Sequence, residues 1–299
     1  MSGPATLLVV IGALYLLECI VAVPGGLVAF RGTARASWRL LGGGFRIGTR
    51  GTRLHFVPLL PWESGLLFAG GEADLAPNRT SPPREPGTSA PDFDIAAVRE
   101  RIAGFRAATA ALRVDAVAMF ALVFIVSPAI VQLLGWDASW PFVAVAVIVI
   151  AGFIVGDHRR AHADLFPETR APIGTLVTLA LSPASAMRAC DPLAREVLAR
   201  RHTLAVACVL CPSAEFERIA AGCVRAWRRG EPPLPTAEAF LTSQLGDLGR
   251  LAAAPERRDA SARSYCPSCL AEFVVESGAC EECGGVGLEP FGERVATHA

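Results

Sequence analysis

Residues 116–156 read AVAMFALVFIVSPAIVQLLGWDASWPFVAVAVIVIAGFIVG, two long apolar runs separated by a short link. The first run covers residues 116–134, the second covers residues 140–156, and the five residues GWDAS lie between them. Each run approaches the ~20 apolar residues that a helix needs to cross the hydrocarbon core of a bilayer. Because the link is so short, we expect two antiparallel neighbours, a transmembrane helical hairpin over residues 114–156.

The composition of the whole chain agrees with a membrane protein. Of its 299 residues, 52% are hydrophobic and only 19% are charged. Basic and acidic residues balance at 28 each, so the overall charge gives no reason to expect a nucleic-acid partner. The basic residues are all arginine, which together with abundant Ala, Gly and Pro suggests a GC-rich bacterial genome.

Another apolar run stands at the N-terminus, where residues 6–23 contain a single charged side chain, Glu18. We expect a first transmembrane helix over residues 1–30. No Arg or Lys precedes the run and no small-residue cleavage site stands out, so it is expected to remain as an anchor. The sequence therefore predicts a mainly α membrane protein with three transmembrane helices.

The positions of the arginines predict the orientation of these helices. Arginines follow the first apolar run, precede the second and follow the third: Arg31, Arg35, Arg39, Arg46, Arg50, Arg53, Arg99, Arg101, Arg106, Arg113, Arg159, Arg160 and Arg170. In such proteins the positive loops stay in the cytoplasm. We therefore expect a multi-pass protein of the bacterial inner membrane, in contact with membrane lipids, with its N-terminus outside and its C-terminus in the cytoplasm.

The first two predicted spans are separated by a soluble stretch with three parts. Residues 31–75 are rich in Gly and in short alternating segments, which predicts a small cytoplasmic β-rich insert. Residues 76–93 are dense in Pro, Ser and Thr, as in a flexible linker. Residues 94–113 then predict a juxtamembrane helix that Asp94 caps.

Beyond the hairpin, residues 157–253 predict a cytoplasmic helical region. Within it, residues 172–187 carry no charge but are short for a span, so they lie at the interface, re-enter the membrane or pack against the hairpin. Asp191 and Pro192 resemble a helix start, and the helix is expected to continue toward Cys211. Residues 254–264 form a polar tether.

The C-terminal tail contains two Cys-x-x-Cys pairs in YCPSCLAEFVVESGACEECGG, residues 265–285. Disulfides would form in an oxidising compartment, but cytoplasmic thiols stay reduced. Cys266, Cys269, Cys280 and Cys283 are therefore expected to bind a metal. Four thiolates suit a closed tetrahedral Zn²⁺ site with a structural role, and iron is the alternative.

With its Cys-Pro-x-Cys first knuckle and the glycines after the second, the stretch over residues 265–292 resembles the zinc-ribbon family. The resemblance implies two knuckles joined by a β-hairpin. It departs from the family pattern in its ten-residue gap between the pairs and in Leu270, where a glycine is usual. From residue 264 onward the chain contains six Glu and one Arg, which gives a net charge of −5. This charge repels nucleic acid and favours a protein partner.

Glu18 is a further candidate, because a carboxyl in the middle of a span is costly unless it is protonated or paired. We expect it to hydrogen-bond within the helix packing or at a homo-oligomer contact, whereas proton translocation would need more polar groups than three spans offer.

Two other pairs carry possible chemistry. His158 and His162 share a helical face and suit metal or acid–base chemistry, although their segment resembles a solvated membrane edge. Cys208 and Cys211 suit a second metal or redox site, although their apolar surroundings favour packing.

The sequence contains no recognisable catalytic motif. It favours a membrane scaffold or regulatory adaptor that presents a cytoplasmic zinc ribbon to a protein partner. The alternatives are a membrane enzyme or transport component that uses Glu18, His158 and His162, and a zinc-responsive regulator.

Overall fold

The fold was analysed in a computed structural model. It describes residues 3–23, 27–32, 38–41, 45–47, 52–57, 66–70, 93–228, 235–251, 253–267, 270–281 and 286–291. The predicted linker over residues 76–93 lies outside this set except for Phe93.

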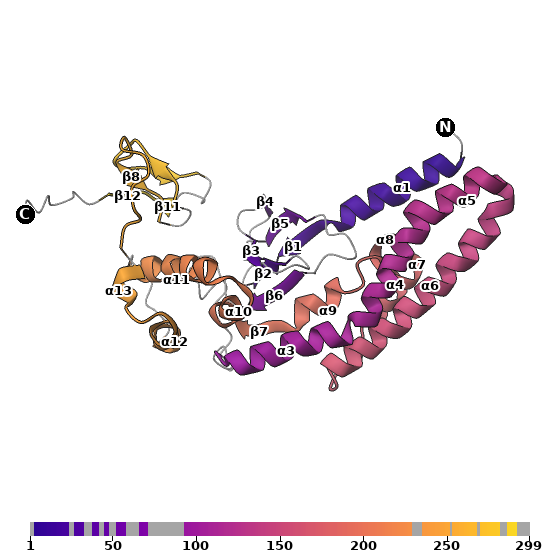
Figure 1. Cartoon of the computed structure of the whole chain (residues 1–299), viewed down its shortest axis with the longest axis horizontal. Helices are drawn as coiled ribbons and strands as arrows, with labels where there is room; N and C mark the ends of the chain where they lie inside the picture. The colour runs from indigo at the N-terminus through magenta and orange to yellow at the C-terminus, as the bar shows by residue number, and fades with distance from the viewer. Residues whose placement is uncertain are drawn as a thin grey trace, which may run out of the picture.

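A long helical hairpin dominates the mostly helical structure (Figure 1). Its first arm comprises α3 (Ile95–Ala108), α4 (Ala110–Ala121), η1 (Leu122–Val126) and α5 (Ser127–Leu134), and its second arm is α6 (Trp136–Leu165). The segments Ala110–Leu134 and Trp136–Leu165 are long and apolar enough to cross a membrane. The turn is tighter than the expected GWDAS loop, because Gly135 alone, at φ 79°, reverses the chain and Trp136 already begins α6.

Many large apolar side chains of the hairpin point outward. Those on α6 and at the end of α5 are Leu133, Leu134, Trp140, Phe142, Val145, Ile148, Val149 and Phe153. A water-soluble protein rarely exposes a continuous apolar surface of this kind, whereas lipid tails would cover it.

The first arm contains one π-helical turn, η1, immediately before Pro128. Proline has no N–H to donate and its ring crowds the preceding turn of a helix. The Ser127 hydroxyl donates to the Leu122 carbonyl at 2.6 Å, and the Ser127 N–H bonds the same oxygen. The wide turn thus accommodates the proline while backbone groups stay satisfied.

The juxtamembrane helix begins where the sequence predicts. The Asp94 side chain accepts hydrogen bonds from the backbone N–H groups of Ala96 and Ala97, which caps α3.

The predicted helix over residues 1–30 is shorter than expected. The structure has α1 (Gly3–Glu18), a turn at Cys19, and then β1 (Ile20–Val23) and β2 (Leu27–Arg31). The β-branched run after Glu18 pairs with β5 (Thr52–Phe56), so strand pairing ends the helix. Glu18 is therefore the last residue of α1, and the prediction that placed it in the middle of a span is wrong.

α1 packs beside the hairpin and runs antiparallel to α4. A side chain at Gly12 would touch Phe124, and the Tyr15 ring contacts the rings of Phe120 and Phe124. The N-terminus therefore points toward the hairpin turn at Gly135, as Figure 1 shows.

The β-rich insert is larger than predicted. The first sheet has the strand order β1-β5-β4, in which β4 is Phe45–Ile47. The second sheet has the strand order β3-β2-β6-β7. Its strands not yet given are β3 (Arg39–Leu40), β6 (Leu66–Gly70) and β7 (Leu198–His202). The first sheet recruits residues assigned to the first span, and β7 comes from the region expected to be helical. β7 pairs parallel to β6.

The region after α6 is broken into short helices. They are α7 (Ile173–Leu181), α8 (Pro183–Ala186), α9 (Asp191–Glu196), α10 (Thr203–Leu210), α11 (Ser213–Arg228), α12 (Pro235–Leu245) and α13 (Leu248–Leu251). The single helix expected from Asp191 toward Cys211 is instead α9, β7 and α10, because the edge of β6 offers hydrogen-bond partners to the backbone of residues 198–202.

The C-terminal module consists of short strands at the far end of the molecule from the hairpin (Figure 1). β8 (Ser264–Tyr265) lies between β9 (Glu272–Phe273) and β12 (Glu289–Pro290), and β10 (Ala279–Cys280) pairs with β11 (Val286–Gly287). Ala262, Tyr265 and Phe291 form its small core, against which Leu270 packs.

Candidate functional site

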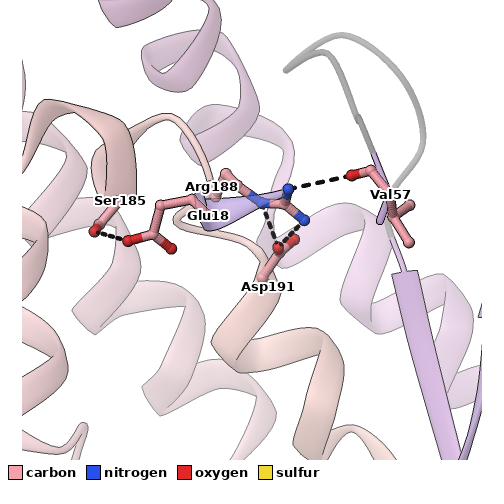
Figure 2. A network of polar contacts seen from close by, with 5 residues as sticks. All are labelled: Glu18, Val57, Ser185, Arg188 and Asp191. Carbon is pink, nitrogen blue, oxygen red and sulfur yellow. Dashed lines mark hydrogen bonds and ion pairs between the residues drawn. The ribbon is translucent and has the colours of Figure 1, made fainter. Parts of the chain in front are cut away.

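A polar cluster joins α1, the first sheet and the segment from α8 to α9; its Ser185 and Arg188 are buried, whereas Glu18 is exposed. We call it the Arg188 junction; Figure 2 shows its members, Glu18, Val57, Ser185, Arg188 and Asp191. Arg188 donates from Nε to Asp191 at 2.7 Å and from Nη1 to the Val57 carbonyl at 3.3 Å. The Ser185 hydroxyl donates to the Glu18 carboxylate at 2.7 Å. Segments far apart in the sequence are thus tied together at the base of the hairpin.

The electrostatics of the junction keep Arg188 charged. Burial opposes its positive charge, but the Asp191 carboxylate at 2.6 Å and the neighbouring Cys19 thiol outweigh it, so the pKa of Arg188 is raised. Nε hydrogen-bonds Asp191, Nη2 forms the ion pair with the same carboxylate, and Nη1 donates to the Val57 carbonyl (Figure 2). The junction therefore resembles a structural clamp more than a reaction centre.

Glu18 belongs to this clamp. Its carboxylate accepts a hydrogen bond from Ser185 of α8, and a role of Glu18 at a homo-oligomer contact stays a prediction. Ser185 and Arg188 were not singled out from the sequence, and Asp191 was noted only as a helix start. The one sequence feature that points to them is Arg188, a lone charge at the end of the apolar stretch over residues 171–187.

His158 and His162 are both buried, so the expected solvated membrane edge is wrong for these two side chains. The reason is that α7, α8 and the chain leading to α9 fold back along α6. His158 Nδ1 lies 3.0 Å from the Ala189 carbonyl, which requires the proton on Nδ1. His162 packs against the Phe166 ring. The contact of His158 fixes the returning chain and leaves that nitrogen unavailable to a metal.

Cys208 and Cys211 are partly buried and pack against the main core, as does the buried Cys223. Burial raises the pKa of the Cys208 thiol, and it raises the pKa of Cys211 and of Cys223 to about 12. Because the thiolate is the nucleophile, raised pKa values disfavour redox chemistry of these thiols at neutral pH, and their packing in the core agrees with the packing role.

The C-terminal cysteines occupy a different setting. Cys266 directly follows β8 and Cys280 ends β10, and both are buried. Cys269 and Cys283 lie outside the described residues, and among the residues that the structure does describe no three His, Cys, Asp or Glu side chains converge on a metal position.

The first knuckle has a defined backbone turn. The Cys266 N–H donates to the Ala271 carbonyl, the Leu270 N–H donates to the Cys266 carbonyl, each at 2.8 Å, and Leu270 adopts φ 63°. This is the position where the zinc-ribbon pattern has glycine, the residue that adopts positive φ without strain. The buried Cys266 thiol, at the start of this turn, is a donor that suits Zn²⁺, and the four-cysteine site itself stays a prediction.

Arg225 connects the helical region to this knuckle. Its buried guanidinium, from α11, donates through Nε to the Pro267 carbonyl at 3.0 Å and through Nη1 to the Leu251 carbonyl at 3.5 Å. One side chain thus bridges the residue after Cys266 and the end of α13. Sequence reasoning missed Arg225, because nothing in the sequence of α11 distinguishes it from the arginines of that helix that are exposed.

No family model matches the chain, and no curated protein or solved structure matches it either.

Proposed function

We propose that this protein is a membrane-anchored scaffold or regulatory adaptor that holds a zinc-binding module in the cytoplasm for a protein partner. The observation that carries the proposal is the separation of the two functional surfaces. An apolar hairpin lies at one end, and an acidic module with buried Cys266 and Cys280 lies at the other (Figure 1).

In this proposal the module is held by Zn²⁺ bound to Cys266, Cys269, Cys280 and Cys283. Bound zinc would supply structural cross-linking of the two knuckles, with no open position for a substrate. The exposed Val274 and Val275 give the module an apolar tip, beside which Glu276 pairs with Arg263 and Glu272 accepts from the Arg258 and Asp259 N–H groups. Such a tip suits a partner with an apolar contact surface, and the net negative charge from residue 264 onward favours a basic rim around it.

The metal site is tested in the full-length chain. We expect wild-type protein in washed membranes to carry about one zinc per chain by elemental analysis. The Cys266→Ser/Cys280→Ser double variant should remain in the membrane without the metal, whereas the matched Cys208→Ser/Cys211→Ser variant should keep it. Metal retained by the first variant would refute the site.

The adaptor function is tested with a photo-crosslinking amino acid at Val274 in living cells. We expect a discrete protein adduct that disappears in the Cys266→Ser/Cys280→Ser background, because the unfolded module no longer presents its tip. The same crosslinker at the exposed Glu238 of α12 should not give that adduct. An adduct insensitive to the cysteine substitutions would argue against a metal-dependent docking module.

The contact between Arg225 and Pro267 favours a zinc-responsive regulator as a second candidate. Because the guanidinium touches the knuckle itself, the order of the knuckle and the order of the helical region are expected to depend on each other.

A further inference from the structure

α7 exposes an apolar stripe that no described residue covers. Ile173, Val177 and Leu181 recur every fourth residue and share one helical face, with exposed fractions of 78%, 49% and 79%. On another face, Leu179 is buried in the main core, so α7 is seated against the rest of the protein by one side only. No charged residue occurs between Arg170 and Arg188.

The length of α7 allows it to enter a membrane but not to cross it. Its nine residues span about 14 Å, roughly half of a ~30 Å hydrocarbon core. The chain leaves α6 at Leu165, runs back beside it as α7, and returns through α8 to Ala189, whose carbonyl bonds His158 of α6. The segment thus begins and ends near the same end of α6.

The break between α7 and α8 meets the two conditions under which irregular backbone is found at membrane depth. Such backbone is tolerated only where protein buries it and its polar groups are bonded. Ala184 and Ala186 are buried, the Ser182 N–H donates to Thr178, and the Ser182 hydroxyl accepts from the Ser185 N–H. On α7 itself the Thr178 hydroxyl donates to the Gly174 carbonyl at 2.8 Å, so the exposed face presents no unbonded hydroxyl there.

We propose that α7 and α8 form a re-entrant segment, and that acyl chains of the cytoplasmic leaflet cover Ile173, Val177 and Leu181. The proposal rests on the membrane anchor of the proposed function. α7 packs along α6, and Val145, Ile148 and Phe153 of α6 are exposed in the same way. Because the exposed apolar surface of α7 continues that of α6, lipid is the favoured occupant of both. A second copy of the chain is the competing occupant.

The test uses the full-length protein with a benzophenone amino acid at Val177 or Leu181, in vesicles of phosphatidylethanolamine and phosphatidylglycerol. The same probe at Val145 of α6 is the lipid-facing reference, and Glu238 of α12 is the water-facing reference. After irradiation we expect adducts to lipid acyl chains at Val177, Leu181 and Val145 but not at Glu238, identified by mass spectrometry.

Two results would overturn the proposal while leaving the anchor intact. A crosslinked dimer at Val177 would identify a second copy as the occupant, and an absence of acyl adducts at Val177 and Leu181 with lipid still attached at Val145 would place α7 in water. Loss of the lipid adduct at Val145 as well would refute the membrane anchor itself.

Discussion

Arg188 shows how one residue can be decisive without chemistry of its own. It pairs with Asp191 three residues later and reaches a backbone carbonyl of the first sheet. Removing one partner of a buried ion pair leaves the other charge uncompensated, which costs about 3–5 kcal/mol. We expect Arg188→Met to lower the free energy of unfolding by an amount of that order in detergent micelles, followed by circular dichroism.

The matched control is Arg218→Met on α11. Arg218 also has a carboxylate partner at the i,i+3 spacing, Glu215, but its side chain is 59% exposed against 5% for Arg188. Exposed pairs contribute about 0–1 kcal/mol, so this variant should unfold almost as the wild type does. If Arg188→Met and Arg218→Met lowered the free energy of unfolding equally, the Arg188 junction would stabilise the protein no more than an exposed ion pair does.

Leu270 provides a second prediction at the same scale. A β-branched side chain tolerates positive φ less well than leucine does, so Leu270→Ile should destabilise the first knuckle by about 1 kcal/mol at nearly constant volume. We expect faster hydrogen exchange in the C-terminal module and weaker zinc retention in competition with a chelator. Leu288→Ile in the same module, at a position without positive φ, should change neither.

Some of these residues were visible in the sequence and others were not. Asp94 acts through its immediate neighbours, and so its capping role followed from local pattern. Leu270 stood out because the zinc-ribbon pattern that the stretch resembles has glycine at that position. The partners of Arg188 include Val57, which lies far away in the sequence, and no local pattern reports a contact of that range.

Helices and strands could likewise be predicted where local sequence determines them, and could not be predicted where a distant strand does. The hairpin followed from hydrophobicity because its length and composition alone suit a bilayer. The end of α1 at Glu18 did not follow, because the apolar run continues to Val23 and only pairing with β5 turns it into a strand. β7 was missed for a related reason, since its strand conformation depends on the edge of β6.

Among the elements, α11 and the first knuckle provide the next prediction. A lysine keeps the charge of Arg225, but its single ammonium cannot reproduce the fork that donates to both Pro267 and Leu251. Arg225→Lys should therefore increase hydrogen exchange around Tyr265 and Cys266 and in α13, while α6 remains unchanged. Arg218→Lys, on the same helix but exposed, should leave both regions as in the wild type. If exchange near Cys266 is unaffected, then Arg225 does not hold the knuckle.

For the whole molecule, orientation decides whether the tail can bind metal at all. The predicted topology places the C-terminal cysteines in the cytoplasm, where thiols stay reduced, and the hairpin turn outside. An impermeant maleimide should therefore label Ala138→Cys, exposed near the turn, in intact spheroplasts, but should not label Cys266 or Cys280.

Inverted vesicles treated with a chelator should give the opposite result, because the tail then faces the reagent and its thiolates are no longer protected by metal. Among the thiols outside the tail, burial raises the pKa of Cys211 and Cys223 to about 12 and keeps these two protonated. Labelling of Cys266 or Cys280 in intact spheroplasts, after an impermeant reductant has opened any disulfides, would place the tail in an oxidising compartment. The two Cys-x-x-Cys pairs would then form disulfides, and a zinc-dependent adaptor could not be sustained.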